Sequence, residues 1–476
     1  AGAAAAAPGA DKVDELFAQF FATGTAPGVA YGVVVDGELV HTGGLGTLRV
    51  GEDATPGPHS VFRIASMSKS FIAATVLLLR DEGVLRLDDA AEHWVPELAG
   101  SPLASEDSAP PTLRQLLSMN AGYPEDDPWA DRLESLPDDE YSALIGEPKS
   151  WAFSSGVAYD YSNLGFTILG RVIQNATGRN FRDVVSERII APLGMTDTVW
   201  SDETIDPSSL ATGYALGDDK GPRANKDAIK DDEAEASWVA QPIQKPGTFA
   251  ALGGIYSSVA DLAVWVAGFI DAWPARDGDD SHPLRRSSRR EMQQVVTAMP
   301  LAVGGGEGVA RAQVHGYCMG LMSQEDLVTG RVIGHSGGYP GFGSRMAWHP
   351  ESKVGVIGLA NGRYGGPYTT VPEAVAAVVA EVPRQLKILP NPAVEESIRP
   401  TIDRAVMSGD FSLIEPLLSS NVDMDEELSK RAAVLEGLAD SHGKLTPVDG
   451  VASPTPAKAS WWLEGERGRV GVSIML

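Results

Sequence analysis

The sequence predicts an α+β fold with a large unit followed by a small one. Apolar runs of strand length occur at residues 28–46 and 330–362, and helical patterns fill the stretch between them. Strands at both ends of the large unit can share one antiparallel sheet that is flanked by helices. The chain has 476 residues, 43% of them hydrophobic, which is enough for a large core and more than one compact unit.

Each element is predicted from its own pattern. Residues 11–24 place Val13, Phe17 and Phe20 on one helical face. Asp36-Gly37 joins two short apolar runs, a strong signal for a hairpin. Residues 330–362 alternate apolar stretches with Gly and Pro, which predicts several antiparallel strands. Further helices are expected over 71–83, 112–122, 163–178 and 257–273, the last with Ser258 as its N-cap.

Composition divides the chain into four segments. These are a flexible tail (1–10), a large domain (11–385), a linker (386–396) and a small C-terminal α+β domain (397–476). The linker is predicted from the prolines of 387–400, and the small domain from two helical patterns and a hairpin that turns at Glu464 to Gly468. In that hairpin we expect both Trp461 and Trp462 to pack in the core. Residues 217–237 are charge-rich and predict a solvated surface loop, with a lid over a pocket as the alternative.

Charge and cysteine content exclude several classes of function. The chain carries 64 acidic and 38 basic residues, a formal net charge of −26, which disfavours nucleic acid and anionic lipid as partners. No apolar run reaches the roughly 18 residues of a membrane span. Cys318 is the single cysteine, so no disulfide within the chain and no cysteine metal cluster can form, and a buried inert thiol is expected. The sequence is compatible with a cytoplasmic or an exported protein and indicates no oligomeric state.

Ser66 and Lys69, in FRIASMSKSF, form the first candidate catalytic pair. An apolar helical pattern follows at once, and residues three apart on a helix share a face. Ser66 in the first turn would lie among unpaired backbone N–H groups that can stabilise an oxyanion. An apolar setting weakens the hold of an ammonium group on its proton, which would let Lys69 activate the hydroxyl. The alternative is a capping serine beside a surface lysine.

Two more polar patterns follow along the chain. Tyr161-Ser162-Asn163 stands on a polar turn before a buried helix, where Tyr161 can carry protons, or alternatively is structural with Asn163 as a helix cap. His335-Ser336-Gly337-Gly338 is expected on an inner strand, where glycine allows close approach and leaves an N–H free to donate. Each pattern except Tyr-x-Asn has a decoy, Ser441/Lys444 for the first and His41-Thr42-Gly43-Gly44 for the last.

The order of these motifs separates them from the decoys. Ser66-x-x-Lys69, then Tyr161-x-Asn163, then His335-x-Gly337 resembles the serine β-lactamase and penicillin-binding-protein superfamily, over about residues 11 to 385. The resemblance is greatest to the group of class C β-lactamases, D-aminopeptidases, D-amino-acid amidases and β-lactamase-type esterases. It implies a β-lactamase/transpeptidase-like fold with a helical lobe beside the sheet, and no metal or organic cofactor.

The resemblance also implies roles. Ser66 would be the nucleophile, Lys69 and Tyr161 the proton-transfer pair, and Asn163 a partner of Lys69 or of the substrate. The oxyanion hole would be the backbone N–H groups of Ser66 and Gly338, with Gly337 also lining the substrate site. His335 stands where many relatives carry lysine, and a histidine is mostly neutral at pH 7, so it would hold a substrate carboxylate weakly.

We therefore expect a serine hydrolase acting on a small amide, a short peptide or an ester, ahead of a β-lactamase or carboxypeptidase. Asp126 and Asp127 would bind a substrate ammonium group, the alternative being an Asp-rich turn before Pro128. Two other hypotheses remain open: a penicillin-recognising sensor that acylates without turnover, and an interaction role for the C-terminal domain with a vestigial hydrolase.

Overall fold

A computed structural model of the chain describes residues 7–126, 130–218, 221–222, 237–304, 311–382 and 391–476. The chain splits into two compact units, Ala1–Gln385 and Leu386–Leu476. Both contain helices and antiparallel strands, so the predicted α+β class is confirmed. No described helix combines the length and apolar character that crossing a bilayer needs.

The large unit is built on one antiparallel sheet whose strands come from both ends of the unit, as the sequence predicts. The strand order is β2-β1-β14-β13-β12-β11-β10-β8, with β9 beside β10. Asp36 and Gly37 both have positive φ, 52° and 88°, as the tight turn between β1 and β2 requires. The strands are β1 (Gly28–Val35), β2 (Glu38–Gly46), β8 (Thr297–Ala298), β9 (Ala302–Gly304), β10 (Arg311–Tyr317), β11 (Met322–Asp326), β12 (Gly330–Tyr339), β13 (Phe342–His349) and β14 (Val354–Ala360).

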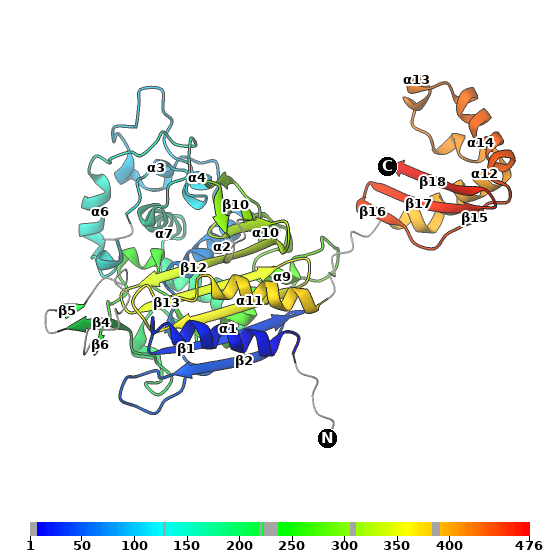
Figure 1. The fold of residues 1–476 in the computed structure, drawn as a ribbon. Helices are drawn as coiled ribbons and strands as arrows, with labels where there is room; N and C mark the ends of the chain where they lie inside the picture. Colours follow the sequence, from blue (N-terminus) through cyan, green and yellow to red (C-terminus); the bar gives the residue numbers. More distant parts are fainter. Residues whose placement is uncertain (1–6, 127–129, 219–220, 223–236, 305–310, 383–390) are drawn as a thin grey trace. The chain divides into compact units, whose positions relative to one another are not determined.

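Helices cover both faces of this sheet. Figure 1 shows α1 (Ala10–Ala22) and α11 (Thr370–Glu381) across one face, where Phe17 and Val375 share a core with β1 and β14. On the other face α9 (Val259–Asp271) and α2 (Ser68–Asp81) join the main core, which continues into the helical lobe. The other α-helices among the described residues of this unit are α3 (Ala91–Trp94), α4 (Leu113–Leu117), α6 (Asp138–Gly146), α7 (Asn163–Thr177), α8 (Phe181–Val185) and α10 (Arg286–Met292).

The predicted helix ends are formed as expected at two places. Ser258 caps α9 by accepting a hydrogen bond from the Asp261 N–H at 3.2 Å. Gly178 ends α7 in the left-handed conformation, with φ 67°. The chain therefore enters α9 and leaves α7 where the sequence predicts.

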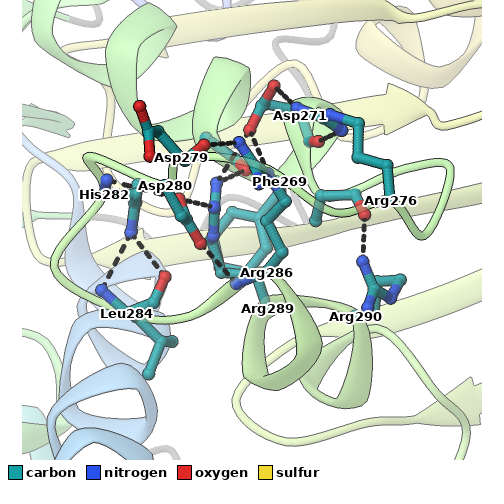
Figure 2. A network of polar contacts seen from close by, with 12 residues as sticks. Phe269, Asp271, Arg276, Asp279, Asp280, His282, Leu284, Arg286, Arg289 and Arg290 are labelled. Carbon is teal, nitrogen blue, oxygen red and sulfur yellow. Dashed lines mark hydrogen bonds and ion pairs between the residues drawn. The ribbon is translucent and has the colours of Figure 1, made fainter.

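An arginine–aspartate network fixes the connection between α9 and α10 (Figure 2). Arg289 is 1% exposed; it donates to Asp280 Oδ1 at 2.6 Å and lies 3.6 Å from Asp271 Oδ2. Burial, and then the Arg289 charge, lower the pKa of His282 to about 4. The Arg289 contacts with Asp271 and Asp280 hold the 272–285 segment against α9 and α10.

The C-terminal unit has its own core around a small sheet. Strands β15 (Thr446–Pro447) and β16 (Ala452–Thr455) flank β17 (Lys458–Gly465), which also pairs with β18 (Gly468–Met475). Trp461 is 2% exposed, but Trp462 is 54% exposed, so the expectation that both are buried is wrong for Trp462. Successive side chains of a strand point to opposite faces, so only one of the two can reach the core. Where the structure describes this unit, its α-helices are α12 (Arg399–Ser408), α13 (Val422–Asp425) and α14 (Leu428–His442).

Two segments of special sequence fall partly outside the described residues. The linker predicted at 386–396 ends in helical turns, because η8 (Val394–Ile398) begins where the Asn391 side chain accepts from the Ala393 N–H at 3.0 Å. Of the charge-rich insertion at 217–237, the structure describes the end of β4 (Tyr214–Asp218), the short strand β5 (Gly221–Pro222) and the start of β6 (Ser237–Ala240).

Candidate active site

Ser66 and Lys69 lie where β3 (Phe62–Arg63) leads into α2. Ser66 is in the short helical turn η1 (Ala65–Met67), and Lys69 is the second residue of α2. The Lys69 Nζ lies 2.9 Å from Ser66 Oγ, and Lys69 is 0% exposed. Ser66 does not occupy a cap position, because the N-cap residues of η1 and α2 are Ile64 and Met67. The structure therefore brings the pair together and contradicts the alternative of a capping serine beside a surface lysine.

The hydrogen bonds of the Lys69 amine determine which side of it faces Ser66. Nζ lies 2.7 Å from Asn163 Oδ1 and 2.7 Å from the carbonyl oxygen of Leu252, in η7 (Thr248–Leu252). Both of these atoms can only accept, so they take two N–H groups of the amine. The third direction points at Ser66 Oγ. A neutral amine would present its lone pair there and could accept the hydroxyl proton.

The backbone around Ser66 is held in an unusual conformation. Ala65, the preceding residue, has φ 49°, a left-handed conformation that costs an L-residue about 1–2 kcal/mol. A Cβ on Gly337 would lie 2.2 Å from the Ile64 carbonyl oxygen and 3.1 Å from the Ala65 Cβ. Glycine at 337 is thus required for β12 to pack against the segment that carries the nucleophile. The expected role of Gly337 toward substrate stays a prediction.

Tyr161 and Asn163 come from the turn before α7 and its first residue. The Lys69 Nζ lies 5.0 Å from the centre of the Tyr161 ring, so the side chains of Tyr161 and Asn163 both lie beside this amine. Ser162, between them, caps α7 by accepting from the Gly165 N–H at 3.3 Å. Ser162 therefore fixes the start of α7, while the side chains on either side of it, Tyr161 and Asn163, lie beside Lys69.

His335 is held between a carbonyl group and a second tyrosine. Its Nδ1 lies 2.6 Å from the Ser336 carbonyl oxygen, and its Nε2 lies 3.0 Å from the Tyr317 hydroxyl. A carbonyl only accepts, so the proton of the neutral ring is assigned to Nδ1, and Nε2 accepts from Tyr317. The Tyr161 ring packs edge-on to Tyr317 at 6.3 Å and lies 6.5 Å from His335. The Tyr317 and His335 side chains therefore both pack beside the Tyr161 ring.

The environment keeps His335 uncharged. Burial, and then the charge of Lys69, lower its pKa to about 3, although the bond to Ser336 opposes the shift. The residue is 1% exposed. The expectation of a neutral histidine therefore agrees with the geometry, and a fixed positive charge is absent from this position.

The edge of β12 is open beside the nucleophile. Among the described residues, β11 pairs with β12 only as far as Gly334, which faces Met322. The β12 backbone from His335 to Tyr339 therefore has no β11 partner, and Gly338 lies on this stretch. An N–H there can donate to a ligand, which is what the predicted oxyanion hole needs.

Asp126 has a different place from the one expected. Its two carboxylate oxygens accept from the N–H groups of Asn163 and Leu164 at 2.7 and 2.8 Å, and the residue is 2% exposed. A carboxylate at a helix N-terminus satisfies unpaired N–H groups and the positive end of the dipole. This arrangement gives Asp126 a structural role in place of ammonium binding. Asp127 lies outside the described residues.

Sequence reasoning missed two contributions to the site. No sequence pattern distinguishes Tyr317. Its neighbour Cys318 is buried, and burial raises the pKa of this thiol to about 12, as for an inert thiol. Arg63 is 1% exposed and forms an ion pair with the buried Glu134, which accepts from the Tyr339 hydroxyl at 2.6 Å. This pair ties β3, just before the nucleophile, to the end of β12. In the sequence, the only sign of this ion pair is Arg63 itself, within the stretch FRIASMSKSF.

The decoys lie elsewhere. His41 is on β2, where its Nε2 lies 2.7 Å from Asp14. Ser441 is the penultimate residue of α14, and Lys444 follows Gly443 on an exposed turn. Within the described part of the chain, no cluster of three or more His, Cys, Asp or Glu could hold a metal ion.

Comparison with known proteins identifies the family of the chain. A sequence model of the family described as "Beta-lactamase" matches residues 13–381. Penicillin-binding protein 4* of Bacillus subtilis is 24% identical over 334 residues, 68% of this chain and 66% of that protein. Protein flp of Staphylococcus aureus is 24% identical over 353 residues, 74% of this chain and 62% of flp. The match thus spans less than two thirds of the length of either relative.

Solved structures share the fold. An octameric penicillin-binding protein homologue from Pyrococcus abyssi has a TM-score of 0.64 at 21% identity, covering 97% of this chain and 90% of its own. A β-lactamase/D-alanine carboxypeptidase from Yersinia pestis has a TM-score of 0.58 at 23% identity, covering 78% and 98%. The predicted β-lactamase/transpeptidase fold is confirmed by these similarities.

Proposed function

The chain belongs to the β-lactamase family, and on that premise we propose that it is a serine hydrolase working through an acyl-enzyme on Ser66. The substrate is a small amide, a short peptide or a carboxylic ester. The observation that carries the proposal is the fully buried Lys69 amine, 2.9 Å from Ser66 Oγ, with its other two directions taken by acceptors.

The reaction begins when the Lys69 amine takes the proton of Ser66 as Oγ attacks the carbonyl carbon. The oxyanion is stabilised by the N–H groups of Ser66 and Gly338. Tyr161, beside Lys69, passes the proton to the leaving nitrogen or oxygen as the bond to carbon breaks. A water molecule then gives its proton to the same pair and its oxygen to the acyl carbon, which releases the acid and restores Ser66.

The neutral His335 supports the choice of substrate class. With a pKa near 3 it carries no charge at neutral pH, so this position lacks the cation that relatives with lysine offer to a substrate carboxylate. This favours aminopeptidase, amidase or esterase activity over β-lactam or peptide carboxylate recognition at this strand position.

The test is a panel of p-nitrophenyl esters, D- and L-aminoacyl p-nitroanilides and nitrocefin, assayed with the wild type and with Ser66→Ala. We expect turnover of an ester or anilide by the wild type, and none by the variant with an unchanged melting temperature. Mass spectrometry should show a transient acyl adduct on Ser66. Equal activity of the two proteins contradicts the proposal.

A second candidate is a penicillin-binding protein that acylates and deacylates slowly. It is favoured by the names of the relatives, which include a penicillin-binding protein and a β-lactamase/D-alanine carboxypeptidase. A benzylpenicillin adduct on Ser66 that persists for hours, with no ester turnover, would establish this candidate and exclude the first.

A further inference from the structure

The hairpin of β12 and β13 carries one of the two proposed oxyanion donors on an edge with little support from the sheet. Among the described residues, β12 beyond Gly334 is paired with β13 and has no partner on the β11 side. Gly338 lies near the end of this stretch, one residue before Tyr339. A two-stranded hairpin is only marginally stable by itself. A donor on it therefore keeps a fixed position only if contacts outside the sheet hold the hairpin.

Glu134 provides such a contact. Its side chain is fully buried, and its Oε2 accepts from the Tyr339 hydroxyl at 2.6 Å and forms the ion pair with Arg63. Arg63 lies on β3, three residues before Ser66, whose N–H is the other proposed donor. One buried carboxylate oxygen therefore joins the strand that leads to the first donor and the hairpin that carries the second.

The backbone of Glu134 is fixed at the same time. Its carbonyl oxygen accepts from the N–H of Gly247, the N-cap residue of η7, at 3.0 Å. The other end of η7 is Leu252, whose carbonyl oxygen accepts from Lys69 at 2.7 Å. The carboxylate is thus attached to the short helix that orients the lysine, and its position relative to the site is set from both sides.

Stability alone does not account for an ion pair at this place. Removing two charges from water costs several kcal/mol for each ion, and apolar side chains of similar volume often stabilise a core equally well. Ion pairs and hydrogen bonds differ from apolar contacts because they have a direction and a length. The Tyr339 bond to Glu134 has the short length, 2.6 Å, that is typical of a hydroxyl group on an ionised carboxylate.

We propose that Glu134 is a positioning residue for the oxyanion hole. Acting through Arg63 on one side and Tyr339 on the other, its carboxylate sets the distance between the two proposed N–H donors. The proposal rests on the proposed hydrolase function and adds to it a residue that does not touch the substrate. The oxyanion develops only in the transition state, so a displaced donor lowers kcat and leaves KM nearly constant.

Tyr339→Phe removes the bond to the hairpin and keeps the pair of Arg63 and Glu134. The phenyl ring can retain the contact of the tyrosine ring, whose centre lies 4.0 Å from Arg63 Cζ. With p-nitrophenyl esters, kcat should fall about tenfold to a hundredfold at a KM within about twofold, less than for loss of a whole donor. The infrared band of the acyl-enzyme carbonyl should move to higher wavenumber, because weaker hydrogen bonds polarise the carbonyl less. A loss of kcat without this shift contradicts a role in the oxyanion hole.

The double variant Arg63→Met with Glu134→Leu separates positioning from stability. It replaces both buried ions by apolar side chains, so the melting temperature should change little or rise, whereas kcat should fall at least as far as in Tyr339→Phe. Asp280→Asn is the matched control, because it removes the carboxylate from Arg289, which is also 1% exposed. This control should lower the melting temperature and leave kcat unchanged.

Crystal structures of the wild type and of Tyr339→Phe test the geometry without any substrate. The backbone nitrogen atoms of Ser66 and Gly338 should lie farther apart in the variant, or the hairpin should adopt several conformations. An unchanged single conformation, or a wild-type kcat in Tyr339→Phe or in the double variant, overturns the proposal. A wild type that turns over no ester refutes the proposed function alone, and the distance between the two nitrogen atoms then decides the role of Glu134.

Discussion

Lys69→Met tests the central contact of the site. Methionine has a similar length and no charge, so it can occupy the same buried space without the amine. Loss of a positioned proton acceptor should lower the rate of Ser66 acylation by about 10²–10⁴-fold. The change also leaves Asn163 Oδ1 and the Leu252 carbonyl without the donor that each has at 2.7 Å. Unpaired buried acceptors cost about 1–3 kcal/mol each, partly offset because a buried amine is removed.

The assay is the pre-steady-state burst of p-nitrophenol from p-nitrophenyl acetate, together with urea unfolding. We expect a burst slowed by at least two orders of magnitude and a folded protein of reduced stability. Lys444→Met is the matched control, since it alters the exposed lysine of the second Ser-x-x-Lys and should change neither quantity. Acylation by Lys69→Met within fivefold of the wild-type rate would refute the role of the amine, which lies 2.9 Å from Ser66 Oγ.

Tyr161→Phe keeps the ring beside Lys69 but removes the hydroxyl, so kcat should fall about 10²-fold or more at nearly constant stability; a small change in kcat would exclude proton transfer by this group. Tyr317→Phe leaves His335 Nε2 buried without its donor and should lower the free energy of unfolding by about 1–3 kcal/mol, with kcat reduced and KM unchanged; unaltered urea unfolding would contradict the assigned tautomer. Asp126→Asn should destabilise the fold by about 0.5–2 kcal/mol through the start of α7, and a selective rise in KM for aminoacyl anilides would instead restore the ammonium hypothesis. His335 has a folded-state pKa of about 3, below the unfolded value near 6.5, so its contribution to stability is complete above pH 6.5 and lost as the pH falls toward 3, by about 1.4 kcal/mol per pH unit. His335→Gln should flatten that part of the pH–stability curve measured by urea unfolding, and parallel curves for the two proteins would argue against a depressed pKa.

The site residues that could be predicted are those marked by local sequence patterns. The Ser66–Lys69 spacing is informative because both residues belong to one continuous helical stretch, which places their side chains on the same face. Tyr161 and Asn163 could be named because the polar turn and its capping Ser162 precede an apolar helix. Their meeting with Lys69 depends on how α7 packs on α2, which no short window of sequence describes.

The residues that were missed depend on contacts between distant segments. Tyr317 meets His335 because β10 and β12 are arranged around β11, and Glu134 meets Arg63 across 71 positions of sequence. Asp126 looked like a substrate ligand because two adjacent acids before a proline carry no sign of which backbone N–H groups they will meet. The exposure of Trp462 could not be predicted for a similar reason, because strand register decides which face of the sheet its side chain joins.

The sequence by itself determined the α+β class, the elements that carry the motifs and the pairing of Ser66 with Lys69, because these follow from periodicity and spacing within a few residues. Only the tertiary structure decided the tautomer of His335 and the structural use of Asp126. Each of these is a question of which polar groups meet after the chain has folded, and burial makes the answer costly to leave unsatisfied.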